Sequence, residues 1–268
     1  MGVSVASPEA PENGEMIPAE RRARIAGMLK ERQAVRVSAL SEDLGVSGMT
    51  IRRDLKRLEV EGVLVRTHGG AILKRHLVEE SLYVERAATR AEEKRRIAES
   101  AAALNKPGET VFLSSGTTAA RVISHVDPSL EARVVTHNVG AVQEAKGMRL
   151  EVILVGGVYK QRSNAVSGPV ALEHINRFRA NTMLLGVDGF DLVEGLTTPT
   201  VGMAGVERAM IAQTRGDVIA LADASKVGVV ADVVICGLDR VDVVMIDDAV
   251  DETVRDKIKS LGLRCIVV

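Results

Sequence analysis

The sequence predicts an α/β protein made of an N-terminal winged helix-turn-helix and a C-terminal domain built on a mostly parallel sheet. Within residues 20–75, three short amphipathic segments precede two β-like runs around a Gly-Gly turn, which is the order of a winged helix-turn-helix. From residue 110 onward, short β-rich runs alternate with helical segments, as in parallel sheets covered by helices. A length of 268 residues accommodates one small and one large domain.

Composition and the ends of the chain narrow the class of protein. Residues 1–17 are rich in Pro, Glu, Ser and Ala, and we predict a disordered tail there. No apolar run approaches the length of a membrane span, and the N-terminus lacks a basic start, so we expect a cytoplasmic protein without a membrane partner. Cys236 and Cys265 lie outside any C-x-x-C spacing and the histidines form no ligand cluster, so we expect no metal and no cofactor.

The three amphipathic segments predict three helices over residues 19–60. In the third, Ile51, Leu55 and Leu58 recur at i, i+4 and i+7, so they share one inward face of a helix. The opposite side is basic, and Ser47 is placed to cap the helix N-terminus. We predict that this helix reads DNA through Ser47, Met49, Thr50, Arg52, Arg53, Lys56 and Arg57. Taken alone, the pattern also fits a solvated surface helix.

Charge is distributed unevenly along the chain. Residues 20–75 hold 13 Lys/Arg against 7 Asp/Glu, whereas residues 76–268 hold 22 against 26. The formal net charge of the whole chain, −1, hides this local excess. A basic first domain favours a double-stranded DNA operator as partner.

The predicted wing follows the third helix and closes a DNA-binding domain over residues 18–75. The segment VLVRTHGGAIL alternates apolar and polar residues and turns at Gly69-Gly70. His68 stands beside this turn, where it fits either a phosphate or minor-groove contact or a structural hydrogen bond. Residues 76–108 are charged and helix-prone, and we expect a connector that transmits orientation or a plain packed helix.

The second domain is predicted over residues 109–268. Its strand-like runs are TVFLSS, RVVTH, EVILVGG, NTMLLGVDG, DVIALAD, VVICG, DVVMID and RCIVV. Ligands of such folds bind at the carboxyl ends of the strands. Small polar residues gather there, above all in the SSGTT turn at residues 114–118, where hydroxyls and a helix N-terminus suit a phosphate.

Further polar groups follow the other strands. Asn138 comes after the second, Gly157 after the third, Asp188 after the fourth and Lys226 after the fifth. One carboxylate, one ammonium and several donors suit a phosphorylated sugar or polyol, with Lys226 and SSGTT on the phosphate and Asp188 on hydroxyls. The chain has no G-x-x-x-x-G-K-[ST], G-x-G-x-x-G or G-x-S-x-G motif, so nucleotide hydrolysis, dinucleotide binding and esterase chemistry lack their usual marks.

These residues resemble the DeoR family of bacterial transcriptional regulators along residues 20–268. The resemblance rests on TIRRDL and HGGA in the first domain, and on FLSSGTT, VVTHN, GVDGFD and LADASKVG in the second. It implies a sensor domain similar to ribose-5-phosphate isomerase, an oligomer such as a dimer or tetramer, and repression of a carbohydrate catabolic operon. Carried over by motif, the effector contacts are Ser115, Gly116, Thr117, Thr118, Asn138, Gly157, Asp188 and Lys226.

The chain departs from the family pattern at several positions. Ser114 stands where an Asp is usual, His137-Asn138 where Asn-Ser is common, and Met203 and Glu207 where an acidic residue and a Lys are frequent. These changes leave phosphate binding in place but put the usual pose of the ligand in question.

We therefore expect a DNA-binding repressor relieved by a phosphorylated sugar or polyol, with no catalytic residues. One alternative is a sugar-phosphate isomerase or transferase with Asp188 as acid/base and Lys226 positioning phosphate; the N-terminal domain argues against it. Another is an activator or dual regulator, because the position of the operator in the promoter decides the sign of the response.

Overall fold

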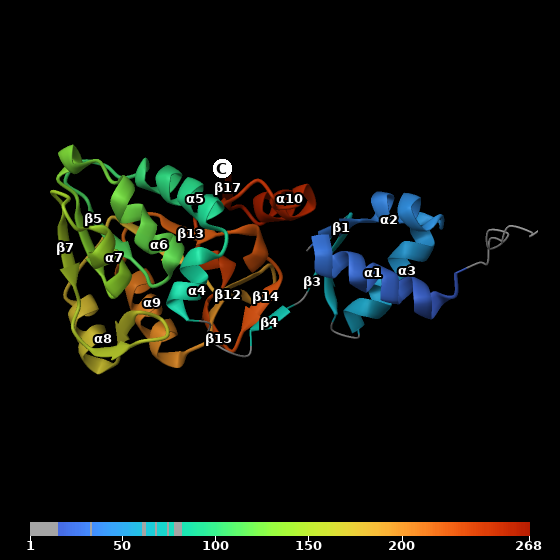
Figure 1. The fold of residues 1–268 in the computed structure, drawn as a ribbon, viewed down its shortest axis with the longest axis horizontal. Coiled ribbons are helices and arrows are strands. Elements are labelled where there is room, and N and C mark those ends of the chain that lie inside the picture. The colour runs from blue at the N-terminus through green and yellow to red at the C-terminus, as the bar shows by residue number, and fades with distance from the viewer. Residues whose placement is uncertain (1–15, 33, 61–62, 68, 74, 78–81) are drawn as a thin grey trace, which may run out of the picture.

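A computed structural model describes residues 16–32, 34–60, 63–67, 69–73, 75–77 and 82–268. Figure 1 shows two lobes, with the N-terminal domain at one end and the larger C-terminal domain at the other. The predicted tail over residues 1–17 falls almost entirely outside the described residues, as does His68. None of the helices in the described ranges is long and apolar enough to cross a membrane.

The N-terminal domain is the predicted winged helix-turn-helix. It contains α1 (Pro18–Arg32), α2 (Val37–Leu44) and α3 (Gly48–Val60), followed by the antiparallel strands β2 (Leu64–Arg66) and β3 (Gly70–Leu73). The turn between α2 and α3 uses Gly45 in the left-handed conformation, with a φ of 64°. Apolar side chains from all three helices, among them Ile25, Leu40 and Ile51, form its core.

One strand of this domain was not predicted. Residues Ala34–Arg36 form β1, which pairs antiparallel with β3, so the wing belongs to a three-stranded sheet in the order β1-β3-β2. Gly70 makes this pairing possible, because a Cβ at this position would lie 1.9 Å from the main-chain oxygen of Val35.

The C-terminal domain is built on a parallel sheet of seven strands in the order β17-β16-β13-β10-β5-β6-β7. The strands are β5 (Thr110–Leu113), β6 (Arg133–Thr136), β7 (Glu151–Leu154), β10 (Thr182–Gly186), β13 (Val218–Ala222), β16 (Val243–Ile246) and β17 (Arg264–Val267). This confirms the predicted α/β fold class.

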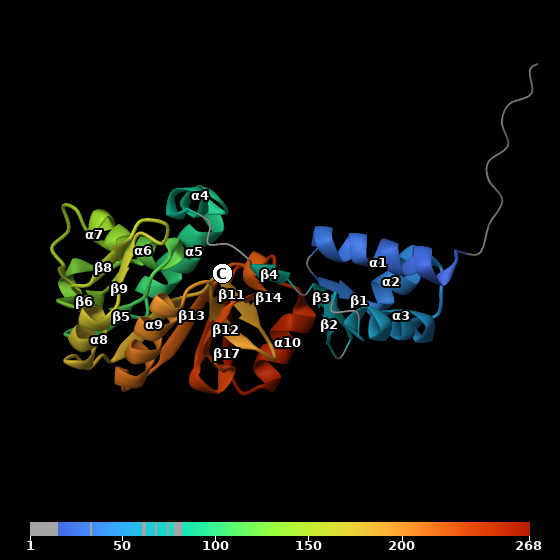
Figure 2. The same cartoon turned by 90° about the horizontal axis from the view of Figure 1, so that it is seen from below.

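Helices cover both faces of the sheet (Figures 1 and 2). One apolar core joins the sheet to α8 (Pro169–Asn176), α9 (Val201–Gln213) and α10 (Glu252–Ser260). The other joins it to α5 (Ala91–Ala102), α6 (Thr117–Val122) and α7 (Val139–Glu144), next to the short helix α4 (Tyr83–Ala88). Short 3-10 helices, η1 (Ile123–His125), η2 (Pro128–Leu130), η3 (Ala224–Lys226) and η4 (Leu238–Arg240), complete the connections.

Smaller sheets depart from the predicted organisation. The run VVICG forms β15 (Val233–Cys236), but it pairs antiparallel with β12 (Gly195–Thr198), which in turn pairs with β11 (Gly189–Asp191). Its assignment to the parallel sheet was therefore wrong. A further hairpin, β8 (Val158–Lys160) and β9 (Ala165–Ser167), follows β7.

The segment predicted as a connector is built into the C-terminal domain. Strand β4 (Arg75–Leu77) pairs in parallel with β14 (Val229–Ala231), although they lie far apart in sequence. Helix α5 buries Ile97, Ala98 and Ala101 in the core on one face of the main sheet. Helix α5 is thus packed on the sheet, and the transmission of orientation by residues 76–108 stays a prediction.

Candidate functional site

Helix α3 presents the predicted DNA-reading surface to solvent. The Ser47 hydroxyl accepts a hydrogen bond from the Thr50 main-chain N–H at 3.2 Å, so Ser47 caps the helix as expected. Ile51, Leu55 and Leu58 are buried, which leaves the basic side exposed. The exposed residues are Met49, Arg52, Arg53, Lys56 and Arg57, whereas Thr50 is half-buried.

Sequence reasoning missed Asp54, which lies on the buried side of the same helix. Its side chain is 5% exposed and accepts a hydrogen bond from Arg21 Nε of α1 at 2.6 Å. Arg22 lies 3.8 Å from its other oxygen. The sequence feature that could have revealed this pair is an acidic residue between Ile51 and Leu58 on the apolar face of the helix. A buried acidic side chain requires a buried cation as partner.

The wing turn lies beside α10 of the C-terminal domain. A Cβ added at Gly69 would stand 3.9 Å from the Thr253 methyl group, and the main-chain oxygen of Gly69 accepts a hydrogen bond from Val37 N–H at 2.8 Å. Arg36, just before α2, forms ion pairs with Asp251 and Glu252 at the start of α10. The contact of the wing with DNA therefore stays a prediction, and the described part of the turn touches the neighbouring domain.

A pocket at the carboxyl ends of the main strands brings together most of the predicted effector residues. Gly116, Thr117, Thr118, Asp188 and Lys226 line it. These residues come from the segments directly after β5, β10 and β13, as expected for a parallel sheet, with Thr117 and Thr118 at the start of α6 and Lys226 at the end of η3. The space left in the pocket is about 20 Å³, which holds roughly one water molecule.

Two cations in this pocket were not predicted. Arg86 of α4 donates a hydrogen bond from Nη1 to Asp188 Oδ1 at 2.7 Å, and Lys94 of α5 is 4% exposed. Burial lowers the pKa of Lys94 to about 8, since the interior disfavours its charge. Both residues come from the segment interpreted as a connector, so no motif pointed to them.

Two predicted effector residues, Asn138 and Ser115, do not line the pocket but form hydrogen bonds beneath its lining. Asn138 is fully buried, and its amide nitrogen donates to the main-chain oxygens of Ser114 at 3.1 Å and Gly116 at 2.9 Å. The Ser115 N–H donates to His137 Nε2 at 2.9 Å. Burial lowers the pKa of His137 to about 4, so its ring stays neutral and accepts this bond. These contacts fix the shape of the SSGTT turn.

Ser114 and Glu207, two residues that depart from the family pattern, form further hydrogen bonds around the SSGTT turn. The Ser114 hydroxyl accepts a hydrogen bond from Gly186 N–H at 2.8 Å and thereby links the ends of β5 and β10. The Ser115 hydroxyl donates to Glu207 Oε1 of α9 at 2.9 Å. Burial raises the pKa of Glu207 to about 8, and the charge of Asp188 acts in the same direction.

Gly157 is not among the residues that line this pocket. Its φ is 145°, and a Cβ there would lie 2.7 Å from the main-chain oxygen of Ser167. Close packing against β9 accounts for the glycine.

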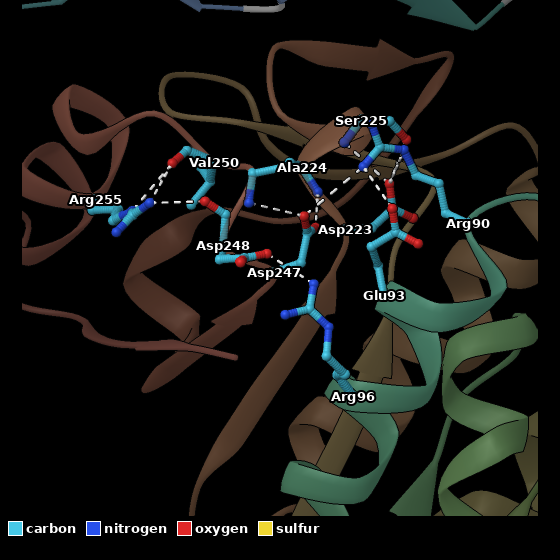
Figure 3. Close-up of polar contacts among 11 residues, drawn as sticks. Arg90, Glu93, Arg96, Asp223, Ala224, Ser225, Asp247, Asp248, Val250 and Arg255 are labelled. Carbon is cyan, nitrogen blue, oxygen red and sulfur yellow. Dashed lines mark hydrogen bonds and ion pairs between the residues drawn. The ribbon is translucent and has the colours of Figure 1, made fainter.

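Figure 3 shows a group of carboxylates around Arg90, close in sequence to Lys226 of the pocket. Asp223 and Asp247 follow β13 and β16, and each is at most 2% exposed. Arg90, at the start of α5, lies 3.8 Å from Asp223 and 3.9 Å from Asp247. Asp247 also accepts the Ala224 N–H at 2.5 Å, so the carboxylates are satisfied by main-chain donors as well as by Arg90.

Comparisons with known protein families match both domains. A family model described as the DeoR C terminal sensor domain matches residues 89–248. A second, described as the DeoR-like helix-turn-helix domain, matches residues 21–76.

Similar proteins extend over nearly the whole chain. The HTH-type transcriptional regulator GlpR of Haloferax volcanii is 33% identical over 251 residues, covering 94% of this chain and 98% of GlpR. The transcriptional repressor AccR of Agrobacterium fabrum is 30% identical over 246 residues, covering 90% of this chain and 95% of AccR. Among solved structures, ribose 5-phosphate isomerase A of Methanocaldococcus jannaschii matches with 16% identity and a TM-score of 0.39, covering 52% of this chain and 55% of the isomerase.

Proposed function

Because the chain belongs to the DeoR family of HTH-type transcriptional regulators, we propose that it represses a carbohydrate catabolic operon and that a phosphorylated sugar or polyol relieves the repression. The chain is a DNA-binding regulator rather than an enzyme, as its relatives are. Repression is supported by AccR, which is named as a transcriptional repressor.

The effector proposal rests on the pocket beside Asp188. Three cations, Arg86, Lys94 and Lys226, line it together with the hydroxyl-bearing Thr117 and Thr118. This excess of positive charge suits a phosphate, while Asp188 suits the hydroxyl groups of a polyol. A ligand with both kinds of group uses the whole pocket, whereas a neutral sugar brings no anion to its cations.

The DNA proposal rests on the exposed side of α3. Arg53 and Lys56 point away from the buried Ile51 and Leu55, at the centre of a helix that is capped at its start. Arg52 and Arg57 flank them, and these side chains suit base edges and phosphates of a major groove. We further propose a cytoplasmic homo-oligomer, a dimer or tetramer, because paired recognition helices read two half-sites of an operator.

The test joins both halves of the proposal. Operator fragments are selected from genomic DNA with the wild-type chain, and each phosphorylated sugar or polyol that raises its thermal stability is then added to the complex. We expect at least one such ligand to weaken DNA binding, and its unphosphorylated form to have no effect. Loss of DNA binding in Arg53→Ala, at a cost of about 1–3 kcal/mol, checks the helix assignment.

Arg179→Ala, which removes an exposed cation of the C-terminal domain, is the matched control and is expected to bind DNA as the wild type does. The DNA half fails if Arg53→Ala binds the operator unchanged. The effector half fails if no phosphorylated ligand stabilises the chain.

A further inference from the structure

The pocket beside Asp188 is small, and α4 contributes Arg86 to its lining. With about 20 Å³ of space, the pocket as it stands is too small for a phosphorylated sugar. Figure 2 shows α4 at the outer edge of the C-terminal domain. None of its described side chains is fully buried, and six residues are too few for a helix to persist alone. Helix α4 therefore depends on its tethers to the domain beneath it.

Two of these tethers end inside the pocket. The first is the hydrogen bond from Arg86 Nη1 to Asp188 Oδ1, at 2.7 Å. The second is Lys94, whose Nζ donates to the main-chain oxygens of Arg86 and, at 2.8 Å, of Thr89. Both act on the C-terminal half of α4, which Arg121 also contacts through the Ala87 main-chain oxygen at 3.1 Å.

The opposite end of α4 is anchored outside the pocket. The Tyr83 N–H donates to the main-chain oxygen of Arg162 at 2.8 Å. The Tyr83 ring packs so closely on Gly140 that a Cβ there would lie 2.1 Å from the phenolic oxygen. These contacts of Tyr83 involve neither Arg86 nor Lys94.

We propose that α4 is a release element whose two pocket tethers are broken by the effector. A hydroxyl group of the ligand takes Asp188 from Arg86, and its phosphate takes Lys94 from the carbonyl oxygens of α4. The C-terminal half of α4 then separates from the pocket while Tyr83 remains anchored. This inference rests on the proposed effector site and adds how that site opens and what its occupation moves.

The charges of the tethers support competition by an anion. The Lys94 ammonium donates to neutral carbonyl oxygens, although it is almost completely buried, and a phosphate would be a stronger partner. Arg86 Nε is buried and has no hydrogen-bond partner among the described residues. The guanidinium group is therefore only partly satisfied where it lies, so displacing it costs less than breaking a fully paired arginine.

Hydrogen exchange of the full-length chain tests this proposal at the amides of Arg86 and Thr89, which donate to Leu82 and Glu85 oxygens within α4. In Arg86→Gln without ligand, we expect exchange about tenfold faster than in the wild type, as for the loss of one charge-assisted hydrogen bond. Inorganic phosphate at millimolar concentration supplies the anion that takes Lys94 but no sugar hydroxyl group for Asp188. By breaking this one tether it should accelerate exchange at the same amides of the wild type, and sodium chloride of equal ionic strength should not.

The control is Arg95→Gln, which removes an exposed arginine paired with Glu92 and Glu99 on α5 and should leave α4 unchanged. Unchanged exchange of α4 in Arg86→Gln overturns the tether. Phosphate that raises the thermal stability of the chain but leaves or slows the exchange of α4 overturns the release and leaves the effector site intact. Phosphate that neither stabilises the chain nor changes exchange contradicts the effector site and the release together.

Discussion

Glu207 is a buried carboxyl group directly behind the turn that is expected to hold a phosphate. One oxygen accepts the Ser115 hydroxyl, and the other has no hydrogen-bond partner among the described residues. Because its pKa is raised to about 8, Glu207 is mostly protonated at neutral pH. A neutral carboxyl group adds no negative charge beside a bound phosphate, so the departure from the usual lysine is compatible with an anionic ligand.

This protonation makes stability depend on pH. The pKa of Glu207 rises from 4.5 for the free side chain to about 8 in the folded chain, so the folded state binds more protons between these values. The contribution of Glu207 to the free energy of unfolding therefore falls as pH rises from 4.5 to about 8. Glu207→Gln, which does not titrate, is expected to show a shallower fall over this window in urea unfolding series. Identical slopes in the two proteins would contradict a protonated Glu207.

At the level of elements, sequence patterns identified those that are long and periodic. Helix α3 was predicted because its buried residues recur over two turns, and the parallel strands because short β-rich runs alternate with helical segments along the chain. Strands β1 and β4 have three residues each, too few for a period to be visible, and they exist because partners distant in sequence pair with them.

The residues of the candidate pocket were likewise predicted only where a local sequence pattern marks them. Its SSGTT turn, Asp188 and Lys226 stand in motifs directly after strands, so sequence reasoning found them. Arg86 and Lys94 lie in helical segments without a motif, and only the packing of α4 and α5 on the sheet brings them to the strand ends.

The pairing of α1 with α3 depends on a buried ion pair, which gives the second prediction. Asp54→Ala leaves the Arg21 guanidinium, 8% exposed, without its carboxylate. We expect a loss of about 3 kcal/mol in the opening free energy of the N-terminal domain, because one buried charge remains uncompensated. Hydrogen exchange of the α1 and α3 amides measures this opening free energy. Asp43→Ala, which breaks the exposed pair with Arg32 on the same domain, is the control and should cost about 0.5 kcal/mol or less. Equal effects of the two substitutions would refute the role of Asp54.

Across the whole molecule, ion pairs and short chain segments link the pocket to the DNA-binding domain. Lys226 of the pocket is three residues from Asp223, which faces Arg90 together with Asp247 (Figure 3). The loop after Asp247 leads to α10, where Arg36 of the N-terminal domain is paired. Arg90 also lines a cavity of about 190 Å³ shared by residues of both domains. Movement at the strand ends therefore has a physical route to the orientation of α3.

The ion pairs of Arg36 with Asp251 and Glu252 are expected to fix this orientation, which gives the third prediction. All three side chains are partly exposed, so salt screens their attraction and their contribution to global stability is small. Arg36→Glu should widen the distribution of distances between the domains, measured by energy transfer between a label on α3 and one on α8, without changing thermal unfolding.

High salt should widen this distribution of distances in the wild type but not in Arg36→Glu. Combining Arg36→Glu with Glu252→Arg reverses the two charges of the Arg36–Glu252 pair and should restore the narrow distribution of distances. If the single and double variants have the same distribution as the wild type, these ion pairs do not orient the domains, and the contacts of the wing turn with α10 are left to do so.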